Sequence, residues 1–467
     1  MTLANSIIYG NESNVISQLQ AGADVNEVDE YGFRPLIEAA IVNKTNIADI
    51  LIRHGAIVDE IDSTGRTALH WAAENNNLEL CSLLISKGAD VNHYTRASQP
   101  VLINPILRNQ SKLKRLLYQN KADLNFALDY INAKLLGHRF ELRGEVDIVD
   151  HKGKFIELDF EGFFLEFTIG IILQSLERYR NNFGARHLRK YFNYVRYLID
   201  AFNIASQLIK YQQYLIKVEE HKSQIDELLS FPLLILPVAH QGHAITFIKF
   251  DEDTWAKCDR GENSLREGSV NIYRVHNRLN LTKQFLRDLI YVRQPKEFIK
   301  KGYKKILHTT LIRHFPMSAQ ITGNCSWSNV EAAIPVIIFL LMTTDKQFNS
   351  SPENIRTTID EALHFYHEWC EWDKDRALHD CIVSFESSSP ARKASKAAIL
   401  GAVLFQCCQE KQPKDVLRAE KILKILTLKP YRYVLDSYIE IHYRRSKTLA
   451  GENLIRLLDT CGINWYS

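Results

Sequence analysis

The second half of the chain contains, in order, the residue types that a cysteine nucleophile needs. Cys325 stands in "GNCSW", directly before a long apolar run, so we expect it at the N-terminus of a helix, where free amide donors and the helix dipole favour a thiolate. His243 opens a predicted strand and is the candidate base; Asp259, 16 residues later on the predicted returning strand, is the group that orients it. Gln320, five residues before Cys325, is the candidate second oxyanion donor. Together these residues predict attack by a thiolate on an acyl carbonyl.

The spacing of His243 and Asp259 predicts that they face each other. If the strands "HAITFIKF" and "TWAKCD" form a hairpin that turns about Asp251, the two residues lie directly opposite each other on one face of the sheet. Their Cβ atoms would then be about 5 Å apart, a distance at which a carboxylate holds an imidazole in one tautomer and stabilises its cation. A longer turn would shift this register.

Each candidate also has a purely structural interpretation. A single cysteine at the start of an apolar helix is more often a small core residue, and a single strand histidine more often packs or bonds a carbonyl. His240, three residues upstream of the candidate base, is a rival that we place on the opposite face of the strand, and His308 and His314 are further rivals. Cys407 and Cys408 lie in an apolar helical pattern and are interpreted as core.

The order His, Asp, Gln, Cys, with His and Asp on adjacent strands, resembles the papain-like cysteine proteases of permuted order over about residues 230–345. These include the ubiquitin-like-protein proteases, the adenovirus protease and bacterial effectors that cleave or acetylate host proteins. The resemblance implies a thiol hydrolase, an acyltransferase or a protease-like pseudoenzyme that serves as a scaffold. In this chain "GNCSW" replaces the usual Asp-Cys-Gly, and the gap between Gln320 and Cys325 is one residue shorter.

Hydrophobic periodicity predicts the elements that must position these residues. The predicted strands are 232–238, 243–250 and 269–275, after a hairpin at 144–160. Helical spacing precedes the three strands and returns from about residue 353 to the end. We therefore expect an α+β, papain-like cysteine protease-like domain over residues 129–350, followed by a helical C-terminal region over residues 351–467.

An internal repeat organises the first part of the chain. "GADVN" at residue 22 returns as "GAIVD", "GADVN" and "KADLN" with a constant period of 33 residues. These segments resemble ankyrin repeats over residues 1–128, which implies an all-α solenoid of about four repeats. Small residues at matching positions, Ala39, Ala40, Ala72 and Ala73, permit close stacking of the helices.

The third repeat tip is the predicted partner contact. It has lost the Asp and Gly of the other tips and gained His93, Tyr94 and Arg96, and Tyr and Arg are enriched in interface hot spots. The alternative is that a diverged tip tolerates drift. Asn92 lies in a leucine-x5-Asp-Val-Asn sequence that resembles the pattern modified by asparaginyl hydroxylases, which implies a host hydroxylase as a second partner. Ordinary turn chemistry is the alternative for Asn92.

Composition excludes several classes of protein. With 467 residues, 46% hydrophobic and 24% charged, the chain is typical of a globular protein of about two to four domains. A net charge of +3 argues against electrostatic nucleic-acid binding, and eight cysteines without metal-ligand or disulfide spacing favour a reducing compartment. The N-terminus lacks a secretory-signal pattern, and "PVIIFLLM" is too short to span a membrane. We expect no cofactor, no metal, and a monomer.

Ankyrin-like repeats joined to a permuted papain-like module resemble the Legionella ankyrin-repeat effectors that type IV secretion delivers into eukaryotic cells. The resemblance implies a virulence protein of the host cytosol or nucleus that binds a host protein through its repeats and perturbs the complexes of that protein. The alternative function is an active cysteine protease or acyltransferase that cleaves or modifies a host protein through Cys325, His243 and Asp259.

Overall fold

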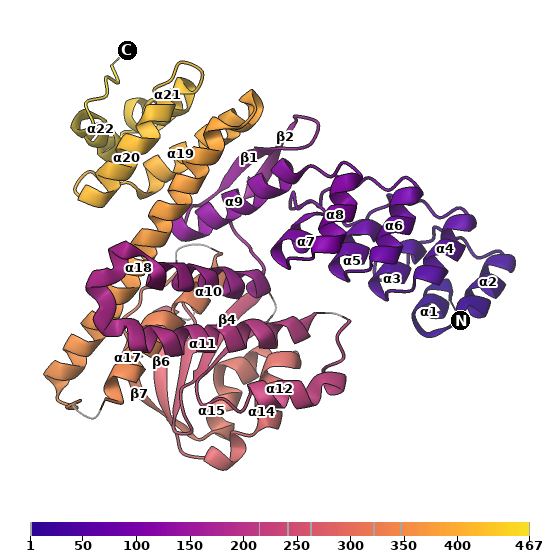
Figure 1. The fold of residues 1–467 in the computed structure, drawn as a ribbon, viewed down its shortest axis with the longest axis horizontal. Coiled ribbons are helices and arrows are strands. Elements are labelled where there is room, and N and C mark those ends of the chain that lie inside the picture. Colours follow the sequence, from indigo (N-terminus) through magenta and orange to yellow (C-terminus); the bar gives the residue numbers. More distant parts are fainter. Residues whose placement is uncertain are drawn as a thin grey trace. The chain divides into compact units, whose positions relative to one another are not determined.

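The computed structural model describes residues 2–213, 215–240, 242–261, 264–320, 323–345 and 348–466 (Figure 1). Tertiary contacts divide the chain into two compact units. Unit 1 contains Met1–Lys134, Gly144–Asp159 and Val383–Ser467, and unit 2 contains Leu135–Arg143 and Phe160–Ile382. Two helices, α9 (Leu124–Phe140) and α18 (Pro352–Glu386), run from one unit into the other.

The first part of unit 1 is a solenoid of antiparallel helix pairs, which Figure 1 shows side by side in chain order. The described residues form four pairs: α1 (Leu3–Tyr9) with α2 (Glu12–Gln20), α3 (Pro35–Ile41) with α4 (Thr45–Arg53), α5 (Ala68–Glu74) with α6 (Leu78–Ser86), and α7 (Ile103–Leu107) with α8 (Ser111–Gln119). The alanines at the repeat positions, Ala39, Ala40, Ala72 and Ala73, are buried. The predicted solenoid of about four repeats is confirmed.

The rest of unit 1 combines a β-hairpin with the C-terminal helices. Its elements are β1 (Glu145–Val149), β2 (Phe155–Asp159), α19 (Pro390–Cys407), α20 (Pro413–Leu426), α21 (Arg432–Ile439) and α22 (Leu449–Thr460). Helix α19 packs against β1, and its Arg392 pairs with Asp123 (2.7 Å) and Asp129 (2.5 Å) near the start of α9. The hairpin and the C-terminal helices therefore belong to the same unit as the repeats. From the sequence we expected the hairpin in the domain of residues 129–350.

Unit 2 is built on an antiparallel sheet whose described strands follow the order β3-β4-β5-β6-β7. The strands are β3 (Leu234–His240), β4 (His243–Lys249), β5 (Thr254–Cys258), β6 (Val270–Val275) and β7 (Thr309–Phe315). The helices are α10 (Leu165–Asn181), α11 (Phe192–Leu208), α12 (Lys222–Leu228), α13 (Ser264–Glu267), α14 (Lys283–Tyr291), α15 (Tyr303–Ile306), α16 (Cys325–Glu331) and α17 (Ala333–Thr343). The α+β class predicted for this region is confirmed, with β7 as a strand that the periodicity had not indicated.

Alternate residues of β3, β4, β5 and β6 face two separate cores. Ile248, Ala256 and Ile272 lie in the core shared with α10, α11, α16, α17 and α18. Ile245, Phe247 and Trp255 lie in the core shared with α12, α14 and α15. Because both of their faces are covered, β3 and β4 are almost continuously apolar.

One helical segment of the described chain, Cys325–Thr343, has the length and mean hydropathy of a membrane span. Within this segment, 83% of an apolar stretch of 18 residues is buried inside the structure. Core helices of globular domains share these properties, and the segment packs against the sheet of unit 2.

Candidate thiol site

Cys325 is the first residue of α16, and α17 continues the same helical path after Ala332, which keeps α-helical dihedrals. The residues that follow Cys325 on α16 are buried, but Cys325 itself is only partly buried. Its Sγ accepts a hydrogen bond from the backbone amide of Ala244 at 3.3 Å. The thiol therefore lies at the N-terminus of α16, next to the first residues of β4, rather than inside the core.

His243 and Asp259 are in direct contact. Nε2 of His243 lies 2.9 Å from Oδ1 of Asp259, and the other carboxylate oxygen, Oδ2, lies 2.9 Å from Nζ of Lys257. Asp259 and Lys257 are buried, whereas the His243 side chain is 33% exposed. Sequence reasoning missed Lys257, although a charged residue two positions before Asp259 on an otherwise apolar strand was the available signal.

The predicted register of the β4–β5 hairpin is wrong by two residues. Thr246 pairs with Cys258, and extending this register places Gly261, rather than Asp259, opposite His243. The turn is centred one residue later than expected, because Oδ1 of Asp251 accepts the amides of Asp253 (2.8 Å) and Thr254 (2.7 Å). Asp259 thus reaches His243 diagonally.

Gly261 makes room for this diagonal contact. A Cβ atom at Gly261 would lie 2.7 Å from Cε1 and 3.1 Å from Nε2 of His243, closer than side chains pack. The backbone amide of Asp259 donates to Ser269 O at 2.8 Å, which continues the β5–β6 pairing and fixes the carboxylate. The absence of a side chain at position 261 is therefore part of the geometry of the site.

The rival histidines occupy different environments. The prediction that His240 lies on the opposite sheet face is wrong: His240 ends β3 and His243 opens β4, and the two are cross-strand partners that share a face. Nδ1 of His314 bonds Oδ1 of Asn271 at 2.6 Å on the neighbouring strand. His308 precedes β7 with a φ of 45°. None of these three is hydrogen-bonded to Cys325 among the described residues.

The electrostatics of the cluster favour a charged pair. The hydrogen bond to Asp259 and the hydrogen bond to Cys325 raise the pKa of His243 to about 9, against the effect of burial. Burial also opposes the Cys325 thiolate, but hydrogen bonds from His243 and the Ala244 amide outweigh it and lower the pKa of Cys325. The pKa of Asp259 is likewise low, because His243 and Lys257 outweigh its burial. Since Nε2 faces Asp259, Nδ1 is the ring nitrogen left for the thiol.

Arg260 ties the segment before Cys325 to the sheet. Its carbonyl accepts the amide of Gln320 at 2.8 Å, and its own amide donates to Oδ1 of Asn329 on α16 at 2.7 Å. Its guanidinium pairs with the buried Glu331 at 3.1 Å. Oε1 of Gln320 accepts the hydroxyl of Ser328, one helical turn beyond Cys325, at 2.9 Å. Gln320 is thus held beside the helix that begins with the thiol, and Arg260 is a second residue that sequence reasoning missed.

The third repeat tip is largely packed within unit 1. Tyr94 contacts Phe126 edge-on with ring centroids 5.7 Å apart, and His93 contacts His70 in the same way at 5.7 Å. Arg96 is exposed. Of the three predicted contact residues, Arg96 is therefore the one whose side chain is most accessible.

Asn92 makes two hydrogen bonds with the next repeat. Its Oδ1 accepts the amide of Asp123 at 2.7 Å, and its Nδ2 donates to Lys121 O at 3.0 Å. Asn26 makes equivalent bonds with Ile57 and Gly55 two repeats earlier. Asn92 therefore joins two neighbouring repeats, and its hydroxylation stays a prediction.

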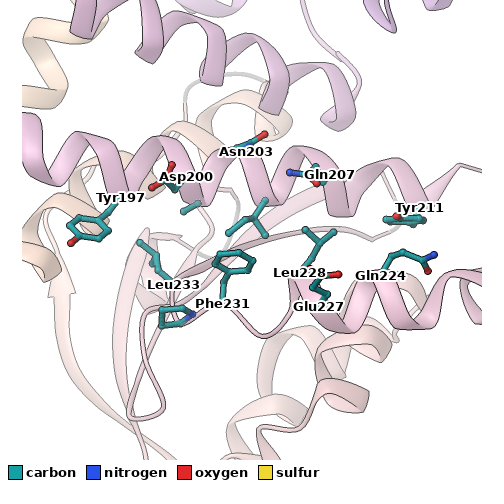
Figure 2. A pocket seen from close by; sticks show the side chains of 13 residues that line it. Tyr197, Asp200, Asn203, Gln207, Tyr211, Gln224, Glu227, Leu228, Phe231 and Leu233 are labelled. Carbon is teal, nitrogen blue, oxygen red and sulfur yellow. The ribbon is translucent and has the colours of Figure 1, made fainter.

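A separate groove of about 710 Å³ runs along α11, α12 and the chain that enters β3 (Figure 2). Figure 2 shows Tyr197, Asp200, Asn203 and Gln207 along α11, and Leu228 and Phe231 on the segment that forms the other side of the groove. No residue of the Cys325 cluster lines it. Among the described residues there is also no group of three or more His, Cys, Asp or Glu side chains that could hold a metal ion.

Comparison with known proteins identifies a matching family and a similar solved structure. The family described as "Ankyrin repeats (3 copies)" matches residues 3–95. The solved structure "Structure of Legionella Effector AnkH" is 47% identical in sequence, with a TM-score of 0.85, and the alignment covers 100% of this chain and 98% of that chain. No curated protein matches this chain.

Proposed function

Because the chain belongs to the same family as the Legionella effector AnkH, we propose that it is delivered into a host cell, where its repeats bind a host protein and its thiol site modifies that protein. The repeats are the part that carries protein-protein interaction, since a rigid solenoid presents its tips at little entropic cost. The thiol site supplies the chemistry. The proposed chemistry is supported by the hydrogen bonds that connect Cys325, His243 and Asp259.

The proposed reaction is acyl transfer through a thioester. The Cys325 thiolate attacks a carbonyl carbon and forms a C–S bond, while the carbonyl oxygen becomes an oxyanion. The Cys325 amide and the side-chain amide of Gln320 are the proposed donors to that oxyanion. Collapse breaks the C–N bond, and the leaving amine takes the proton from His243. Water, or an amine or hydroxyl acceptor, then gives a proton to His243 and attacks the thioester carbonyl. A C–O or C–N bond forms and the C–S bond breaks, which regenerates the Cys325 thiolate and makes the site a hydrolase or an acyltransferase.

Binding without chemistry is the second candidate function. Val28 and Ile61 occupy the same position in successive repeats and are 48% and 40% exposed, so the tips offer apolar contact area. In this case the repeats displace the normal partners of the host protein, and unit 2 acts as a support.

Labelling of Cys325 by iodoacetamide tests the chemistry. We expect Cys325 to react at least about 10-fold faster at pH 7 than the other cysteines, since a lowered thiol pKa raises the thiolate fraction. Cys370 and Cys461 are internal controls, because burial raises the pKa of both thiols. Uniform labelling, or an unchanged Cys325 rate after His243→Ala, contradicts the proposal.

A capture experiment separates the two functions. A partner protein isolated from eukaryotic lysate on the wild-type chain should be cleaved or covalently modified, and the same partner held by Cys325→Ala should be intact. A partner that both proteins capture unchanged supports binding alone.

A further inference from the structure

A basic segment follows helix α14. Between residues 293 and 305 the sequence contains six lysines or arginines and one acid, Glu297. Three of these cations, Arg293, Lys296 and Lys300, form no ion pair with a carboxylate in the part of the chain that the structure describes. A π-helical turn, Phe298–Gly302, interrupts the segment, and such turns occur often at functional sites.

This segment lies beside the edge strand of the sheet. Helix α14 packs against β3, and Nε2 of Gln212 donates to both Pro237 O (3.4 Å) and Ile290 O (3.1 Å), which ties the end of α14 to the strand. β3 is the outer strand and ends at His240. The chain that leaves α14 therefore starts close to the end of the sheet that carries the thiol site.

His240 connects the basic segment to the site. It is the cross-strand partner of His243, so it lies next to the proposed base. Burial, and then the positive charges of Lys296, His243, Arg293 and Lys300, lower the pKa of His240, in keeping with the packing of α14 against β3. The side chain is only 6% exposed, yet neither ring nitrogen has a hydrogen-bond partner among the described residues. A buried imidazole without a partner costs free energy, which an incoming polar group would relieve.

We propose that His240, Arg293, Lys296 and Lys300 form an anion-recognition surface for an acidic segment of the substrate protein, next to the carbonyl that Cys325 attacks. This inference rests on the proposed function and adds the substrate class to it. The cations, which are exposed or half-buried, attract the acidic segment and guide it into the site beside His240. The surface selects protein segments rich in Asp, Glu or phosphorylated residues over neutral and basic ones.

Bromoacetyl peptides test the surface on the full-length protein. In one peptide the residues after the bromoacetyl group are glutamates. In the matched neutral peptide they are glutamines. We expect the acidic peptide to alkylate wild-type Cys325 about 10-fold faster than the neutral one, with the ratio falling as salt is added, because charge steering is screened. In Arg293→Glu/Lys296→Glu/Lys300→Glu the ratio should fall to about one or below.

A control variant carries the same change in net charge elsewhere in unit 2. Arg196→Glu/Lys210→Glu/Lys222→Glu alters three exposed residues and should keep the wild-type ratio. An equal loss of the ratio in both variants, or no acidic preference in wild type, overturns the anion surface. Alkylation of Cys325 by iodoacetamide, a small neutral reagent, should be the same in all three proteins. If iodoacetamide fails to label Cys325 in wild type, the result contradicts the proposed chemistry and also the anion-recognition surface that rests on it.

Discussion

Nε2 of His243 lies 2.9 Å from Oδ1 of Asp259, and this contact decides which nitrogen of the ring is free for chemistry. A carboxylate on one side of an imidazole fixes the tautomer and stabilises the cation that forms when the thiol loses its proton. The buried Lys257 holds the second oxygen of the same carboxylate, so Asp259 stays ionised in spite of its burial. The Cys325 thiolate therefore depends on the Asp259 carboxylate, which Lys257 holds in position.

Replacing Asp259 by Asn tests this dependence. The amide removes the negative charge beside His243, so the pKa of His243 should fall and the fraction of Cys325 present as thiolate at pH 7 should fall with it. We expect iodoacetamide to label Cys325 about 10- to 100-fold more slowly. Labelling at the wild-type rate by a folded variant would rule out the role of Asp259.

Asp259→Asn also leaves Lys257 without its partner, and an orphaned buried charge costs about 3–5 kcal/mol. The double variant Asp259→Asn/Lys257→Met removes that charge and is the matched control. We expect it to recover stability in urea unfolding but to keep the slow labelling. Recovery of both would mean that the single variant acts through the fold alone.

The pH dependence of labelling has a definite sign. In the folded protein the pKa of Cys325 is lowered and that of His243 is raised to about 9, so the thiolate and the imidazolium coexist between the two values. The labelling rate should rise as pH passes the lowered thiol pKa and change little from there to about pH 9. In His243→Ala the rise should move to higher pH, toward the ordinary thiol value. Superimposable profiles for the two proteins would contradict the ion pair.

The types and order of the candidate residues could be predicted from the sequence, but their register could not. Cys325, His243 and Asp259 were found because each stands next to a recognisable element boundary. Register depends on where a turn is centred, and the Asp251 side chain fixes that centre through bonds that have no signature in hydrophobic periodicity. The same two-residue shift hid the importance of Gly261.

Long-range packing was equally invisible in the sequence. The 33-residue period gave the solenoid directly, because each repeat contacts its neighbours in the chain. The hairpin near residue 150 joins unit 1 through α19, which begins more than 200 residues later in the sequence. The face of His240 was predicted wrongly for a related reason. His240 and His243 belong to two antiparallel strands, and the prediction counted them along one strand.

Gly261→Ala should disable the site without unfolding the protein. The added Cβ would lie 2.7 Å from Cε1 of His243 and push the ring from Asp259, so we expect labelling of Cys325 to slow by about 10-fold or more. Gly170→Ala, on α10 of the same unit, is the matched control, because nothing lies within 4 Å of its added Cβ. Thermal unfolding checks that both variants fold. A wild-type labelling rate in Gly261→Ala would show that the ring can move freely.

Glu38 in α3 gives unit 1 a pH-dependent stability. Burial and the nearby Asp29 raise the pKa of Glu38 to about 8, from an ordinary value of 4.5. The folded state therefore holds a proton that the unfolded chain releases, and the free energy of unfolding falls as pH rises from about 4.5 to about 8. Glu38→Gln should stabilise the repeats by about 1–3 kcal/mol at pH 8 and by almost nothing at pH 4.5.

Hydrogen exchange of the α3 amides in the full-length chain, corrected for intrinsic rates, measures this effect locally. Slower exchange in Glu38→Gln at pH 8, and equal exchange at pH 4.5, is the expected pattern. The same difference at both pH values would show that ionisation of Glu38 is not the cause.

The predicted partner contact on the third repeat tip can be tested because its residues have different structural roles. Tyr94 packs against Phe126, so Tyr94→Ala should lower the free energy of unfolding of unit 1 by about 1–3 kcal/mol, and any loss of partner capture would follow from the damaged tip. Arg96 is exposed, so Arg96→Glu should change stability by less than about 0.5 kcal/mol. If the tip binds the partner, Arg96→Glu alone should abolish capture from eukaryotic lysate. Capture that survives Arg96→Glu in a protein of unchanged stability would move the contact to the first two tips, where Val28 and Ile61 are exposed.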